Sequence, residues 1–197
     1  WEGWIRFHYL GILPMLLPMF LVILCALSVL TETRASAWKL LCALPVSKAA
    51  IYLSKLVVIA VVFALAHLLF MLLMVLIPLS IRHGFPSPFP AMLLGKLAAG
   101  TIVGCLGILS LVYLAAYFSR SFVLPLAVGI LGFVLAQLIA DYNLDGTYFP
   151  FSWPARAIEG LFQNTPVGKP LILSLICAFL LALGGMWLAR RDRTKRL

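Results

Sequence analysis

Five apolar runs, each about as long as a transmembrane helix, occupy most of this 197-residue chain. A helix needs about 20 mostly apolar residues to cross a bilayer. Because lipid offers the backbone no hydrogen-bond partner, runs of this kind form helices. The sequence therefore predicts an all-α polytopic helix bundle, a single transmembrane domain over residues 1–197. The predicted spans are residues 9–30, 51–80, 92–118, 122–140 and 171–189.

Composition excludes the other broad classes of protein. Hydrophobic residues make up 64% of the chain and charged residues 11%, against about 45–50% and about 25% in a soluble domain. Disordered, fibrous and disulfide-rich chains need charge, periodic glycine or dense cysteine, which this sequence lacks. The formal net charge of +9 is typical of basic loops retained on the cytoplasmic side of a membrane, and we expect no nucleic-acid partner.

The basic residues predict an orientation. Ten of the 15 lysines and arginines lie in or beside the loop after the first span, the turn between the third and fourth spans, and the C-terminal tail. By the positive-inside rule these segments are cytoplasmic, so the C-terminus is inside and Trp1 is outside. An odd number of spans and a start on Trp1 lead us to expect a further span before this sequence. We expect the chain in a bacterial cytoplasmic membrane.

The cytoplasmic connection over residues 31–50 is too elaborate for a simple turn. Trp38, Leu41 and Cys42 recur at helical spacing, which predicts a short amphipathic helix on the membrane surface. Pro45 breaks this helix, and Ser47 is a candidate N-cap for the next span. Such a helix could receive force from a cytoplasmic partner, or it could simply anchor the loop at the interface.

The external segment over residues 141–169 mixes aromatic residues with prolines. We expect one or two short helices that dip into the outer interface, covered by protein or water. The segment could act as an external gate or as a surface cap on the bundle. The candidate gate residues are Tyr148, Pro150, Trp153 and Pro154.

Polar residues are scarce inside the predicted spans. His67 and Gln137 are candidates for a substrate path, because polar groups are costly in lipid, although a structural histidine explains His67 as well. Gly100, Gly104 and Gly107 form a small-residue face, which favours close helix packing within the bundle or across a dimer.

Motifs for soluble catalysis are missing from the sequence. It contains no phosphate-binding loop, no zinc-protease motif and no nucleophile elbow, so we expect no catalytic residue and no metal site. The four cysteines read as small buried residues: Cys25, Cys42, Cys105 and Cys177.

The first cytoplasmic loop carries a recognisable pattern. Glu32 is followed by a basic amphipathic stretch, then by the run 44–48, Leu-Pro-Val-Ser-Lys, and by Lys55. This pattern resembles that of ABC type-2 transporter permeases, and within them the small permeases of lantibiotic-immunity and bacitracin-type exporters. Members of the family have six spans with both termini inside, of which this chain would cover the second to the sixth.

The resemblance implies a permease that works with two ATP-binding cassette subunits and a second permease, identical or homologous, within membrane lipid. ATP and magnesium would bind to the partner ATPase and no cofactor to this chain. Residues that match the family's coupling segment would dock on the ATPase: Glu32, Arg34, Trp38, Lys39, Pro45, Ser47 and Lys48.

The expected function is export by alternating access, with an antimicrobial peptide or another amphipathic compound as cargo, in immunity or resistance. Two alternatives remain: a secondary transporter without an ATPase, and a non-transporting assembly factor or an intramembrane enzyme that uses His67.

Overall fold

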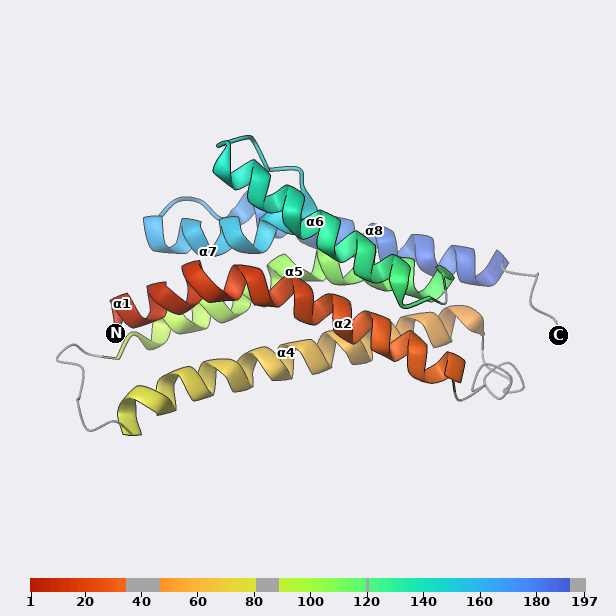
Figure 1. Ribbon diagram of the computed structural model, residues 1–197, viewed down its shortest axis with the longest axis horizontal. Helices are drawn as coiled ribbons and strands as arrows, with labels where there is room; N and C mark the ends of the chain where they lie inside the picture. The colour runs from red at the N-terminus through yellow and green to blue at the C-terminus, as the bar shows by residue number, and fades with distance from the viewer. Residues whose placement is uncertain (35–46, 81–88, 120, 192–197) are drawn as a thin grey trace.

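The computed structural model describes residues 1–34, 47–80, 89–119 and 121–191, and every regular element in these ranges is helical. Within them four helices are long and apolar enough to cross a membrane, or five if α1 and α2 form one bent span. The predicted all-α bundle is confirmed (Figure 1). The elements are α1 (Glu2–Arg6), η1 (Phe7–Ile12), α2 (Leu13–Arg34), α4 (Lys48–Ser80), α5 (Ala91–Ser119), α6 (Val123–Asp141), η2 (Pro150–Ser152), α7 (Trp153–Gln163) and α8 (Gly168–Arg191).

The first span is broken near its start. The helix begins at Glu2, before the predicted first span, and passes through the π-helical turn η1, so that residues 2–11 and 16–31 meet at a bend of 51°. Pro14 and Pro18 explain the break, because a proline removes a backbone N–H and its ring clashes with the carbonyl four residues earlier. For Pro14 that carbonyl lies within η1.

Helix α4 is one continuous helix of 33 residues. At 1.5 Å per residue it is about 50 Å long, against a hydrocarbon core of about 30 Å. The sequence left open whether this run tilts or begins as a separate interfacial helix. The continuous helix favours the tilt, because no break divides it.

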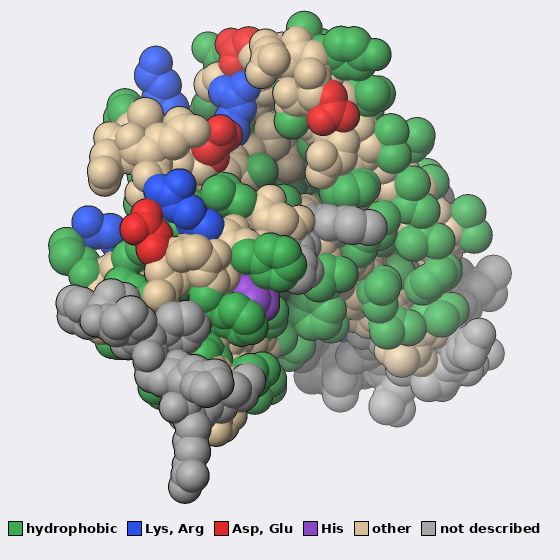
Figure 2. Space-filling model, turned by 60° about the vertical axis from the view of Figure 1, so that its left-hand side comes forward, with side chains coloured by type: hydrophobic (Ala, Val, Ile, Leu, Met, Phe, Trp, Pro, Cys, Tyr) green, Lys and Arg blue, Asp and Glu red, His purple; other side chains and the backbone are tan. Residues whose placement is uncertain are grey.

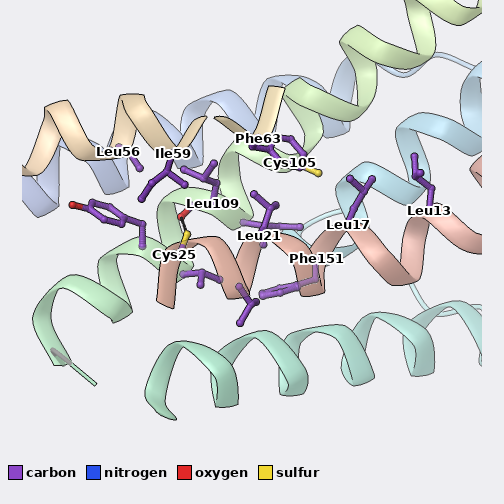
Figure 3. Close-up of a cluster of buried hydrophobic side chains, with 14 of the residues drawn as sticks. Leu13, Leu17, Leu21, Cys25, Leu56, Ile59, Phe63, Cys105, Leu109 and Phe151 are labelled. Atoms are coloured by element: carbon purple, nitrogen blue, oxygen red, sulfur yellow. Dashed lines mark hydrogen bonds between the residues drawn. The ribbon is translucent and has the colours of Figure 1, made fainter. Parts of the chain in front are cut away.

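Helix α5 is the centre of the bundle, packed against α2, α4, α6, α7 and α8. On the side of α2 that faces α5, Leu13, Leu17 and Leu21 form a row of residues four apart, as the helical repeat requires (Figure 3). Cys25 extends this row, and its thiol points to the carbonyl of Leu109 on α5 at 3.9 Å. Cys25 and Cys105 are both buried and free, as predicted from the sequence. Cys177 is only partly buried, because it lies on the less enclosed helix α8, and Cys42 lies outside the described residues.

Helices α2 and α6 approach each other closely at one point and then separate. A methyl group on Gly129 of α6 would collide with Val22 of α2, and one on Gly132 would collide with the ring of Phe151. From there α6 and α2 diverge, and α7 lies between them (Figure 1). We call this the α7 end of the bundle. At the other end, the α2–α4 end, α2 finishes, α4 starts and α8 finishes.

Candidate functional site

Helix α7 is seated on the small-residue face of α5. A Cβ on Gly107 would lie 2.6 Å from Cζ3 of Trp153, and one on Gly104 would lie 3.0 Å from Cα of Pro154. The same face reaches Leu161, whose Cδ1 is 3.2 Å from a Cβ on Gly100. The glycine face and two of the candidate gate residues, predicted separately, therefore meet in one contact.

The four gate candidates differ in burial. Trp153 is 3% exposed, and its indole N–H donates a hydrogen bond to the carbonyl of Thr147 at 2.8 Å. Pro150 begins η2, where its missing N–H costs nothing. Tyr148 is 79% exposed. Of the four candidates, Trp153 and Pro154 pack directly on the glycine face of α5.

A serine from α8 enters the backbone of α5 at the same place. The Ser174 hydroxyl lies 2.8 Å from the carbonyl of Val103 and 3.0 Å from that of Gly104, and it accepts a hydrogen bond from the N–H of Gly107 at 3.0 Å. Val103 and Gly107 are four residues apart, so the hydroxyl bridges groups that an α-helix normally pairs with each other. The contact ties α8 to the turn of α5 that supports Trp153.

Beside α7 lies a cavity of about 840 Å³. It occupies the space between the diverging helices, with η1 and the start of α2 on one side, α6 on another, and α7 and the start of α8 around it. One part of its wall is apolar, as shown by Leu10, Pro14, Phe133 and Phe151. The other part carries amides, hydroxyls and charges. The cavity is amphipathic.

Charged groups gather at the rim of the cavity. Arg156 of α7 lies 3.5 Å from Asp145, and it donates hydrogen bonds to the hydroxyl of Thr147 and the carbonyl of Leu144. Lys169 and Glu159 also line the cavity, and Glu159 accepts a hydrogen bond from Gln163 at 3.0 Å. Figure 2 shows charged side chains gathered on one part of the surface and hydrophobic side chains dominating another part.

The Asp145 carboxylate is held in its ionised form. Hydrogen bonds from the Thr147 hydroxyl and backbone N–H lower the pKa of Asp145, and the positive charges of Arg156 and Lys169 lower it further. The loop around Asp145 is therefore organised by a carboxylate that stays charged at neutral pH.

The two candidate residues of the substrate path lie in different surroundings. Gln137 lines the cavity. His67 is 4% exposed, between the rings of Phe63 and Phe70 and next to Tyr9, and it is not among the cavity's lining residues. The structure does not bring His67 and Gln137 together.

The coupling candidates flank a part of the chain outside the described residues. Trp38, Lys39 and Pro45 lie in that part, and the backbones of Glu32 and Arg34 form the last turn of α2. Two candidates begin the next helix. Ser47 accepts a hydrogen bond from the N–H of Ala50 at 3.2 Å, which confirms it as the N-cap of α4, and Lys48 is the first residue of that helix.

Sequence reasoning missed Ser174 and Arg156. A serine in an apolar span gives little signal, since it usually bonds back to its own helix, as Ser28 and Ser54 do. Arg156 was counted only as an external positive charge. Its place in the amphipathic stretch of α7 was the one available signal.

Comparison with known proteins gives a family but no individual relative. Residues 1–136 match the model of a family described as "ABC-2 family transporter protein". No curated protein and no solved structure matches the chain. The matched region runs from α1 into α6, and thus includes the connection between α2 and α4 that carries the coupling pattern. Since the match covers more than half of the sequence, the chain belongs to the ABC-2 transporter family, the transmembrane permease components of ABC transporters that work with an ABC ATPase.

Proposed function

We propose that the protein is the permease subunit of an exporter for amphipathic compounds, with antimicrobial peptides as the first candidate and immunity or resistance as the role. Membership of the ABC-2 family supports the transport class. The observation that carries the proposal further is the seat of α7, an amphipathic helix that closes one end of the bundle by packing Trp153 and Pro154 against α5. We propose that α7 is the external gate.

The charges at the two ends of the bundle support this orientation. The described residues of the α2–α4 end include Lys48, Lys55, Arg190 and Arg191. The α7 end carries both signs, with Glu2, Arg6, Asp145, Arg156 and Glu159 among its side chains. Over the whole sequence, ten lysines and arginines belong to the α2–α4 end with its loops and the C-terminal tail, against five on the other side. By the positive-inside rule we infer that the α2–α4 end, with the C-terminus, faces the cytoplasm.

Coupling to the ATPase is assigned to the connection between α2 and α4. Both helices that flank it end on the proposed cytoplasmic side, so a push there would act directly on two spans. Glu32 and Trp38 are the residues that we expect to contact the ATPase. A second permease, identical or homologous, would complete the transporter.

Cargo would pass along a path that includes Gln137, which is already accessible from the cavity. His67 is enclosed by aromatic rings in this structure, and we propose that it meets cargo only when the bundle opens. The rings of Phe63 and Phe70 offer His67 no catalytic group, and a histidine with a single tyrosine beside it is a poor catalytic set, which disfavours an intramembrane enzyme.

The test is co-expression of the permease with its partner ABC ATPase, in cells challenged with antimicrobial peptides. Glu32→Ala and Trp38→Ala should leave the membrane level of the permease unchanged and abolish both resistance and cargo-stimulated ATP hydrolysis. Glu2→Ala, at the other end of the bundle, is the matched acidic control, and Trp187→Ala, on the exposed side of α8, is the matched tryptophan control. Full resistance in both coupling variants would refute the assigned coupling role.

A further inference from the structure

The cavity beside α7 has features that neither the family nor the gate accounts for. Ser152 lines it, is only 6% exposed, and its hydroxyl has no hydrogen-bond partner among the residues that the structure describes. Lys169 also lines the cavity, and within the described part of the chain it forms no ion pair.

The cavity is graded in polarity along the bundle. Two of its charged groups lie near helix ends: Lys169 is the second residue of α8, and Arg156 of α7 contacts Asp145 and Leu144 in the loop after α6. Its apolar wall reaches down α6 to Phe133, eight residues or about 12 Å below Asp141. A membrane shows the same change in polarity, from the lipid head groups to the upper part of the acyl chains, over a similar distance.

The charges at the polar end balance one another. Arg156 and Lys169 are positive, and Glu159 and the adjacent Asp145 are negative. In a ligand with one negative and one positive group, the negative group could lie near the two basic side chains and the positive group near Glu159. A ligand with only a negative charge would be repelled by the Glu159 carboxylate. The volume of about 840 Å³ lies within the usual range for sites that hold one small amphiphile.

From this geometry we propose that the cavity binds a zwitterionic glycerophospholipid of the phosphatidylethanolamine type. Its phosphate lies against Lys169 and Arg156, its ammonium lies against Glu159, and its first methylenes lie along Phe133. The site is a lipid site on a single permease chain, and it rests on the proposed function only in placing the α7 end at the outer leaflet.

The test is native mass spectrometry of the full-length permease, purified with its ATPase in maltoside detergent without nucleotide or cargo. Four probes are titrated: dioleoylphosphatidylethanolamine, dioleoylphosphatidylglycerol, dioleoylglycerol and phosphoethanolamine. The first should bind with a single tight site and at least about tenfold more tightly than the other three, since charged hydrogen bonds of this kind change affinity by about that factor. Equal binding of the two phospholipids overturns the zwitterionic assignment, and equally tight binding of phosphoethanolamine overturns the lipid assignment.

Variants locate the site. Lys169→Gln and Glu159→Gln change exposed side chains, so the fold should be kept, and each should weaken phosphatidylethanolamine binding by about tenfold. Lys96→Gln, an exposed lysine of α5 outside the cavity, is the matched control and should bind as the parent does. Unchanged binding in both cavity variants, or equal weakening in the control, would place the lipid elsewhere. Because the assay needs neither ATP nor cargo, a negative result leaves the export proposal standing, and loss of resistance in the coupling variants leaves this one standing.

Discussion

Replacing Gly107 by alanine tests the seat of α7 directly. The new Cβ would lie 2.6 Å from Cζ3 and 3.0 Å from Cε3 of Trp153, and 3.2 Å from the Ser174 hydroxyl. Ordinary carbon contacts are about 3.5–4.0 Å, so the indole must move by about 1 Å. The ring cannot shift freely, because its N–H is bonded to Thr147. Overpacking of this size costs about 1–3 kcal/mol.

A second glycine in the same helix provides the control. Nothing lies within 4 Å of a Cβ on Gly95. Both substitutions gain the same helix propensity, about 1 kcal/mol, so the difference between Gly107→Ala and Gly95→Ala isolates the steric cost. We expect Gly107→Ala to be less stable than Gly95→Ala by about 1–3 kcal/mol.

The assay is reversible unfolding of the purified permease in mixed micelles of increasing sodium dodecyl sulfate content, followed by circular dichroism. Near-ultraviolet spectra should also change in Gly107→Ala and stay unchanged in Gly95→Ala, because only the former moves an indole ring. Equal stabilities and equal spectra for the two variants would refute the contact between α7 and α5.

Three further predictions concern the same end of the bundle. Ser174→Ala should lower stability by about 1–2 kcal/mol in the same assay, whereas Ser54→Ala, whose hydroxyl bonds only within its own helix, should change it by less than about 0.5 kcal/mol; similar losses would contradict the bridge into α5. Thr147→Val should raise the pKa of Asp145 towards its ordinary value, because the largest cause of its lowering is removed. In the parent protein, whose Asp145 has a lowered pKa, the carboxylate contributes its full stabilisation at neutral pH and loses it as the pH falls through that pKa. The measurement is a pH titration of the ¹³C chemical shift of the labelled Asp145 carboxylate. If the hydrogen bond from Thr147 were absent, the titrations of the parent and of Thr147→Val would coincide. Trp153→Phe should cost about 0.5–1.5 kcal/mol through its lost indole hydrogen bond, and equal stability would indicate that the N–H is bonded to water instead.

Long apolar runs made the spans predictable, since length and hydropathy alone decide whether a segment can cross a bilayer. The bend in the first span was harder to predict, because Pro14 and Pro18 lie in a sequence that is apolar on both sides of the break. Prolines in membrane helices are tolerated with or without a bend, depending on what packs around them.

The candidate functional site was also only partly predictable from the sequence. Gly104 and Gly107 were predicted to support close packing, but a small-residue face does not specify its partner. The partner is α7, because Pro154 and Trp153 present a flat surface that fits over two missing side chains. The cavity could not be predicted at all, since it arises where two helices that touch at Gly129 move apart.

The bridge formed by Ser174 has a consequence for how such a bundle can move. One hydroxyl engages three backbone groups of α5, and the same turn supports α7, so α5, α7 and α8 should travel as one rigid body. Between α2 and α6 a close contact at Val22 and Gly129 is apolar, and apolar surfaces can slide without breaking hydrogen bonds. The protein should therefore open between α2 and α6, with α7 moving together with α5 and α8.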